Sequence, residues 1–421
     1  MGQNTGIGIA APAAKLHIKG SSNSTQLMVD AYSGQANSNP LILLRSSSGK
    51  SLVWIHSDHE SNVFIGLNAG RVNDTSSGVA KGRLNTFIGS SAGNSNTSGN
   101  ANTANGYQSL YANTTGIHNT GHGVYTLYSN TTGNSNTATG VQALYLNTTG
   151  SFNTASGDLS LYANVNGISN TAYGYQSMES NVSGNYNTAM GVATLYTNWT
   201  GNENTACGIA SLYNNTTGSD NTAVGFHALV NNTGGSNNIA IGANSGTISF
   251  APNVSNTIGI GNDDLLHGSS NQVLIGNTSM VSIGGHVNWG VYSDARIKNN
   301  IVEDVAGLPF ILKLRPVTYH ISSKAITSIT GNKETPSFPG KFAADKIKRS
   351  GFLAQEVEQA AKSANYDFSG YTKPENPSEL YTIRYAEFVV PLVKAVQEQQ
   401  TMIDRLEKEV EELKMIIKKG N

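Results

Sequence analysis

The sequence predicts a mainly β protein: a parallel β-solenoid fibre of 17-residue repeats, then an α+β domain and a C-terminal coiled-coil helix. Three observations predict it. A tetrad Asn-Thr-small-x followed by Gly recurs every 17 residues without insertion or deletion. Charge changes abruptly, because no Lys or Arg lies between Arg83 and Arg296, whereas 36 of the 53 charged residues lie in 293–421. Residues 389–421 carry an apolar seam with alternating spacings of three and four.

Composition excludes several classes of function. With a net charge of -1 and a middle without cations, the chain lacks the main electrostatic term of nucleic-acid binding. A single cysteine, Cys207, excludes an internal disulfide and a multi-cysteine metal site. No stretch reaches the ~18 apolar residues of a membrane-spanning helix, so no membrane insertion is expected. Met1–Asn4 shows no basic region before an apolar run, so we expect no signal peptide.

Residues 1–84 are predicted to form a β-rich N-terminal fibre segment. Leu41–Leu44 and Leu52–Ile55 are apolar runs of strand length, and 14–18 suggests another strand. Val63–Gly66 is similar to a degenerate first member of the repeats that follow.

Residues 85–245 hold ten repeats. Each is expected to form a four-residue strand over Asn-Thr-Ala-x that ends at Gly, with the asparagines stacked in ladders that satisfy turn groups at every level. The repeats start at Asn85, Asn102, Asn119, Asn136, Asn153, Asn170, Asn187, Asn204, Asn221 and Asn238. Residues 246–292 continue the theme with altered spacing and are predicted to form a β-rich cap or neck.

The second half of each repeat leaves two alternatives open. The spacing of Val141, Leu144 and Tyr145 fits one helical turn or a second short strand. Tyrosines recur at one offset and either present a face to sugars or, as we favour, pack between coils. This row consists of Tyr111, Tyr128, Tyr145, Tyr162, Tyr196 and Tyr213.

Residues 293–390 are predicted to form an α+β domain. Val302–Leu314 is apolar enough for a core helix, and the polar segment 322–349 is expected to be an exposed insertion. A strand, a helix and a second strand are expected at Leu314–Ile321, Gly351–Glu358 and Tyr381–Tyr385. In the coiled coil 389–421, β-branched residues at a and Leu at d favour dimers.

The junction between fibre and domain places Ser293 and Lys298 five residues apart. A serine hydroxyl becomes a nucleophile beside a base, and Lys serves as that base when burial or a nearby cation depresses its pKa. The alternative is a structural one, in which Ser293 and Asp294 form an N-cap and an acidic first turn, and Lys298 is solvated.

Four blocks resemble the C-terminal intramolecular chaperone domain of phage tail spikes and endosialidases. They are the SDARIK run from Ser293, LRPVTYHI from Leu314, GFLAQEVE from Gly351, and the terminal coiled coil. The resemblance implies a domain that trimerises, helps the fibre fold and then acts as an autocatalytic serine endopeptidase, with no evident activity on external substrates. It implies Ser293 as nucleophile, Lys298 as general base and Tyr292-Ser293 as the scissile bond, supported by Asp294 and Arg296.

The repeats resemble the heads of trimeric autotransporter adhesins and tail fibres, which implies a parallel homotrimer. The N-terminal GIG…PAAKLHI stretch is similar to that of tail-fibre proteins. These resemblances imply a receptor-binding adhesin of a phage tail or an extracellular contractile injection particle, assembled in the bacterial cytoplasm. Its partners would be its own copies, a cell-surface glycan or protein, and a baseplate or tail component bound through the N-terminal part.

The alternative function is a tail-spike depolymerase that hydrolyses surface polysaccharide. Glu203 and Asp220 share one offset in consecutive repeats, so their carboxylates would stack and serve a retaining glycosidase or a Ca²⁺ ion. Three copies of His122 would hold a metal if its slot faced a threefold axis. Because both offsets tolerate many residue types, we favour simple surface positions, and we expect no cofactor and no metal.

Overall fold

The computed structural model describes residues 5–7, 16–18, 27–30, 39–76, 81–246, 252–262, 269–286, 290–330, 341–377 and 379–420. The chain divides into two compact units, the first covering Met1–Gly259 with Ser269–Gln272, and the second the remainder. In the first unit β1 (Thr5–Ile7) pairs in parallel with β2 (Leu16–Ile18). β3 (Ile42–Arg45), β4 (Ser51–His56) and β5 (Val63–Ile65) form an antiparallel meander. The two apolar runs therefore form the strands predicted for them.

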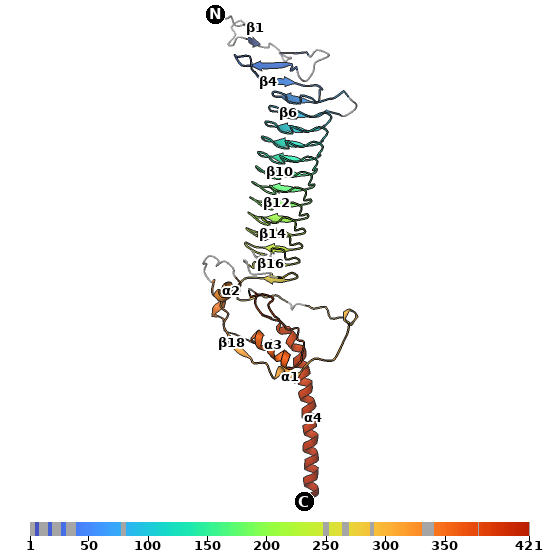
Figure 1. Cartoon of the computed structure of the whole chain (residues 1–421), viewed down its shortest axis with the longest axis vertical. Coiled ribbons are helices and arrows are strands. Elements are labelled where there is room, and N and C mark those ends of the chain that lie inside the picture. The colour runs from blue at the N-terminus through green and yellow to red at the C-terminus, as the bar shows by residue number, and fades with distance from the viewer. Residues whose placement is uncertain are drawn as a thin grey trace. The chain divides into compact units, whose positions relative to one another are not determined.

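The solenoid is a stack of coils, each contributing one strand to a single parallel sheet (Figure 1). β5 pairs with β6, so Val63–Ile65 is the degenerate first coil that the sequence predicts. Residues 81–246 are described throughout and contain ten strands, and successive strands among these ten pair residue for residue at a spacing of 17. The N-terminal neighbour of the first of them, β6, is β5, which lies outside this spacing. They are β6 (Thr86–Ile88), β7 (Thr103–Asn105), β8 (Thr120–His122), β9 (Thr137–Thr139), β10 (Thr154–Ser156), β11 (Thr171–Tyr173), β12 (Thr188–Met190), β13 (Thr205–Cys207), β14 (Thr222–Val224) and β15 (Ile239–Ile241). β16 (Ile258–Ile260) follows at a spacing of 19 after β15.

Each strand has three residues rather than the predicted four, because the repeat asparagine lies just before the strand with its side chain turned inward. The Asn153 backbone N–H donates to Asn136 Oδ1 at 3.0 Å, and Asn153 Nδ2 donates to the Gly167 carbonyl at 2.8 Å. A second ladder runs through Asn164, whose Nδ2 donates to Asn147 Oδ1 and to the same Gly167 carbonyl. These asparagines are fully buried, so the predicted ladders exist and satisfy turn groups inside the stack.

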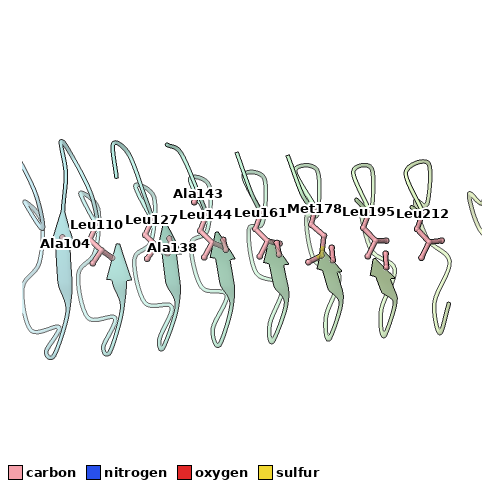
Figure 2. Packing of buried hydrophobic residues seen from close by; sticks show 14 of the residues in the cluster. Ala104, Leu110, Leu127, Ala138, Ala143, Leu144, Leu161, Met178, Leu195 and Leu212 are labelled. Atoms are coloured by element: carbon pink, nitrogen blue, oxygen red, sulfur yellow. The ribbon is translucent and has the colours of Figure 1, made fainter. Parts of the chain in front are cut away.

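The core between strand and turn is narrow and apolar. In most coils a buried Ala at the centre of the strand faces a buried Leu from the turn, such as Ala138 and Leu144 (Figure 2). The Leu–Tyr segment is neither a helical turn nor a strand, because left-handed and right-handed residues alternate along it. Gln142 and Leu144 have φ of 56° and 53°. Their N–H groups reach Val124 in the coil before and Ser160 in the coil after, respectively. Both predicted alternatives were therefore wrong for this segment.

The second unit begins with β17 (Val273–Ile275) and η1 (Ala295–Ile297), and contains a small α+β domain. β18 (Val317–Tyr319) pairs antiparallel with β19 (Arg349–Gly351), and β20 (Tyr371–Thr372) with β21 (Thr382–Ile383). The helix α3 (Ala354–Ser363) packs over a core of Phe310, Val357, Ala360, Ala361, Phe368 and Phe388. The predicted strand at Leu314–Ile321 and the predicted helix after Gly351 are thus confirmed, and the strand predicted at Tyr381–Tyr385 is present but shorter.

One prediction for this unit was wrong. The helix expected over Val302–Leu314 is only the single turn α1 (Leu308–Ile311), since Pro309 sits at its start and Val302 is 68% exposed. The segment 322–349, expected as an exposed insertion, contains α2 (Ser323–Thr330) and η2 (Ala344–Lys346), and most of its described residues are exposed or half-buried. Asp345 of η2 accepts hydrogen bonds from the Ser323 backbone and hydroxyl, which fixes the start of α2. Residues 331–340 lie outside the described part.

The chain ends in η3 (Tyr385–Phe388) and the 32-residue helix α4 (Val389–Gly420). The first turns of α4 belong to the domain: Ala395 is buried, and Glu398 Oε2 accepts the Leu308 N–H of α1 at 2.8 Å. From 401 to 419 every residue is exposed. Within the described part of the chain, the apolar seam of α4 from 401 to 419 therefore packs against no other element.

Candidate functional site

The junction Tyr292–Lys298 is organised by one aspartate. Asp294 lies at the N-cap of η1, and its Oδ1 accepts the Arg296 backbone N–H at 2.9 Å. The Arg296 guanidinium pairs with the same carboxylate, with 2.6 Å between Nη2 and Oδ2. These bonds lower the pKa of Asp294 and raise that of Arg296. In the single chain Arg296 therefore pairs with Asp294.

The turn of η1 brings Lys298 back towards Ser293. Lys298 Nζ donates a hydrogen bond to Ser293 Oγ at 2.7 Å, and Ser293 immediately follows the peptide bond from Tyr292. The cap of this turn is made by the side chain of Asp294, and the hydroxyl of Ser293 is paired with the amine. A general base needs to lie about 2.6–3.2 Å from the heavy atom whose proton it abstracts, so the distance between Nζ and Oγ suits proton transfer from hydroxyl to amine.

The junction is open to solvent in the single chain. Tyr292 is 95% exposed, and every residue of η1 is exposed. Ser293 and Lys298 are also exposed, so in the single chain they are hydrogen-bonded to each other without being buried.

The sequence did not predict how the domain holds its terminal helix. Glu398 caps α1 from α4, and a Cβ on Gly307 would come within 2.6 Å of its carboxylate. Gly307 is thus required for the close approach of α1 and α4. The only local sequence signal for the start of α1 was the run Gly307-Leu308-Pro309, because Pro is favoured in the first turn of a helix. The Tyr385 hydroxyl accepts the Phe352 N–H at 3.1 Å, which joins η3 to the start of α3.

The fibre residues singled out by the sequence lie on different parts of the coil. Glu203 and Asp220 are exposed and left-handed, with φ of 56° and 58°, directly before the buried asparagines. His122 and Cys207 end strands β8 and β13 on the outer side of the sheet. Among the described residues no group of three or more His, Cys, Asp or Glu is placed to hold a metal ion.

The tyrosine row packs between coils, as we favoured. Rings of consecutive coils stack almost parallel, with centroids 5.0 Å apart for Tyr128 and Tyr145 and 5.2 Å for Tyr145 and Tyr162. Because each ring face is covered by the next ring, these faces are not offered to sugars. The row is interrupted by Glu179, which separates Tyr162 from the stacked Tyr196 and Tyr213.

Comparisons with known proteins bear on the second unit. None of the helices in the described part of the chain combines the length and apolar character needed to cross a bilayer. No curated protein and no solved structure matches the chain. A family model does match, and its match begins at Ser293 itself and ends just after α3, which leaves β20, β21, η3 and α4 outside it. Residues 293–366, directly after the β-solenoid fibre, match the peptidase family described as the chaperone of endosialidase.

Proposed function

We propose that this chain is a trimeric tail fibre that binds a cell-surface glycan or protein. Its C-terminal domain acts as an intramolecular chaperone and then cuts the Tyr292-Ser293 bond. The fibre is a β-solenoid, and the domain behind it matches the chaperone of endosialidase family. We place the protein in a phage tail or an extracellular contractile injection particle, joined to a baseplate or tail component through its N-terminal part.

One observation supports self-cleavage most directly: the hydrogen bond between Lys298 Nζ and Ser293 Oγ, at the residue where the family match begins. In the proposed reaction Ser293 Oγ attacks the carbonyl carbon of Tyr292 while neutral Lys298 takes the hydroxyl proton. The C–N bond breaks as that proton passes to the leaving nitrogen of Ser293, and an ester remains. Water then hydrolyses the ester, which frees the Tyr292 carboxylate and restores the hydroxyl.

Assembly supplies what the single chain lacks. Three assembled copies would enclose the junction and remove the amine of Lys298 from water. Cleavage would then follow folding and assembly, so that the fibre is released only once it is built. Asp294 is assigned a positioning role, because its carboxylate fixes the turn that returns Lys298 to Ser293.

The first test is the intact mass of purified protein. Wild type should give two fragments, with the second beginning at Ser293, whereas Ser293→Ala and Lys298→Met should each give one full-length chain. The matched control is Ser322→Ala, an exposed serine of the same domain, which should cleave as wild type does. Two fragments from Ser293→Ala would overturn the assignment of the nucleophile.

A further inference from the structure

Two neighbouring rows of side chains make one long, mostly apolar face on the solenoid. The slot row consists of the last residue of each strand β6–β15, and the ridge consists of the residue two positions later, directly after the glycine that ends the strand. Seven of the ten ridge residues are bulky and apolar although they are 38–53% exposed; they are Tyr107, Val124, Val141, Tyr175, Val192, Ile209 and Phe226. Slot residues such as Tyr173, Met190 and Val224 are 39–47% exposed, whereas Asn105, His122, Thr139 and Ser156 in the same row are polar. An exposed, mostly apolar surface of this length marks an interaction site.

The face is almost without charge. Asp158 is the one acidic residue in the two rows of the ten coils, and there is no Lys or Arg. Its Oδ1 accepts the Val141 backbone N–H of the preceding coil at 2.8 Å, so this carboxylate is directed along the ridge. The other exposed large apolar residues of these coils are spread over four other coil positions, as with Phe152, Val182 and Trp199. The ridge and slot row are therefore a distinct stripe.

The periodicity of the stripe indicates what covers it. A partner in contact along its whole length must present complementary side chains at the coil spacing, about 4.8 Å, over many coils. A globular receptor has no such period, whereas another copy of this solenoid has it at every level. The seam of α4 is likewise exposed from 401 to 419 and has a pattern that only further helices of the same kind would bury.

We infer that the ridge and slot row form the face through which copies of the solenoid pack side by side in the assembled fibre. This rests on the proposed trimer, in which threefold symmetry makes the copies parallel. The other faces of the coil then stay outside and available to a receptor. Along the fibre about a dozen apolar residues per copy enter the interface, which with their flanking threonines approaches the roughly 20–30 residues per side of a standard interface.

The experiment compares thiol labelling at two exposed positions in a Cys207→Ser background, which removes the single native thiol. Ile209→Cys places a thiol on the ridge, and Thr200→Cys places one on an exposed turn of the preceding coil. In the native full-length protein we expect a maleimide to label Ile209→Cys at least tenfold more slowly than Thr200→Cys, with equal rates after denaturation. The wild-type thiol of Cys207, in the slot row, should be protected to a similar degree without any substitution of the face.

Mass by light scattering separates the possible failures. A threefold mass with equal labelling of the two cysteines overturns the inference and leaves the trimer standing. A single-chain mass overturns the proposed trimer and this inference with it. As a second measurement, Ile209→Asp should abolish assembly and Thr200→Asp should preserve it. A full assembly of Ile209→Asp would also contradict the inference.

Discussion

Individual residues in the coils accept backbone conformations that their side chains disfavour. Leu144, Gln142 and Phe152 all have φ between 53° and 61°, a region that costs a non-glycine residue of order 1–3 kcal/mol. A glycine would relieve the strain at Leu144 and would remove the side chain that fills the core. Coil-to-coil hydrogen bonds and burial offset the cost, and this compensation repeats at each level.

One residue at the N-terminal end of the solenoid is sensitive to pH. His56 is 5% exposed and lies between Trp54 and Phe64, and burial lowers its pKa from 6.5, against the opposing charge of Asp58. The unfolded chain therefore binds a proton at a pH where the folded chain does not. Stability is full above about pH 6.5 and falls as the pH drops towards the folded-state pKa. The protection factors of the amides in β4 and β5, which correct for the intrinsic slowing of exchange in acid, should fall on acidification in wild type and not in His56→Leu.

The exposed His118 provides the matched control for that measurement. His118→Gln should keep the wild-type pH dependence of exchange in β4 and β5. If His56→Leu showed the same acid sensitivity as wild type, another group would be responsible.

The proximity of Ser293 and Lys298 could be predicted from the sequence, whereas the turn that carries Leu144 could not. Ser293 and Lys298 are only five residues apart, so any tight turn between them brings hydroxyl and amine together, and family blocks pointed to both. The left-handed Leu144 was not predictable, because Leu is rare at positive φ and its spacing from Val141 equally fits a helix. The cap of α1 by Glu398 joins residues 90 apart, and no local pattern carries that information.

At the scale of the coil, the large side chain that fills the core comes from the strand in some coils and from the turn in others, so the filled volume stays similar. In the first coils the strand provides Phe64 and Phe87, and the turn provides Gly70 and Gly93. A Cβ on Gly93 would lie 2.5 Å from the Phe87 ring. Later coils use Ala in the strand and Leu in the turn, so the same space is filled from the other side. Periodicity predicted the strands correctly, but this exchange depends on facing side chains rather than on the period.

Exchanging the large and small residues at positions 87 and 93 should reveal the energetic coupling between strand and turn. Phe87→Ala should cost roughly 3–5 kcal/mol through the cavity that it leaves, and Gly93→Leu should clash with the ring. The double variant should recover most of the loss, except for about 0.5–1.5 kcal/mol of stacking on Phe64, 5.2 Å away. Denaturant unfolding of the three variants measures the coupling, and strictly additive losses would contradict it.

Glu179 interrupts the tyrosine row and is the position where a substitution should stabilise it most. Its Oε2 is shielded from solvent. Burial raises the pKa of the neighbouring Tyr196, and the charge of Glu179 and a side-chain hydrogen bond between the two residues add to this. Glu179→Tyr should stabilise the solenoid by about 1 kcal/mol, because it completes the stack between Tyr162 and Tyr196. Glu179→Gln removes the charge without the ring and is the control. A tyrosine variant no more stable than the glutamine variant would show that stacking adds nothing.

At the scale of the whole molecule, the proposed chaperone role means that the fibre depends on the second unit in order to fold correctly. Each coil buries its surface only on its neighbours, so a partly built stack exposes apolar turns and unpaired strand edges. A chain lacking 293–421 should therefore give aggregated or misassembled fibre, whereas full-length Ser293→Ala should give the complete assembly. Circular dichroism and sedimentation of the two proteins measure the difference.

Wild type after cleavage is the matched control for this comparison. Its released 1–292 fragment should remain assembled even though the same segment cannot reach that state when made alone. If the shortened chain formed the same fibre as the cleaved product, the second unit would have no chaperone role.

The uninterrupted 17-residue register has a consequence for how such a gene can change. Every ladder joins a residue to its equivalent one coil away, so gaining or losing one whole repeat leaves all remaining pairings intact. Slippage or unequal recombination between repeats would lengthen or shorten the solenoid by whole coils. A loss of one residue would instead shift both asparagine ladders out of line. The length of the solenoid can therefore vary between descendants while the segments before and after it stay the same.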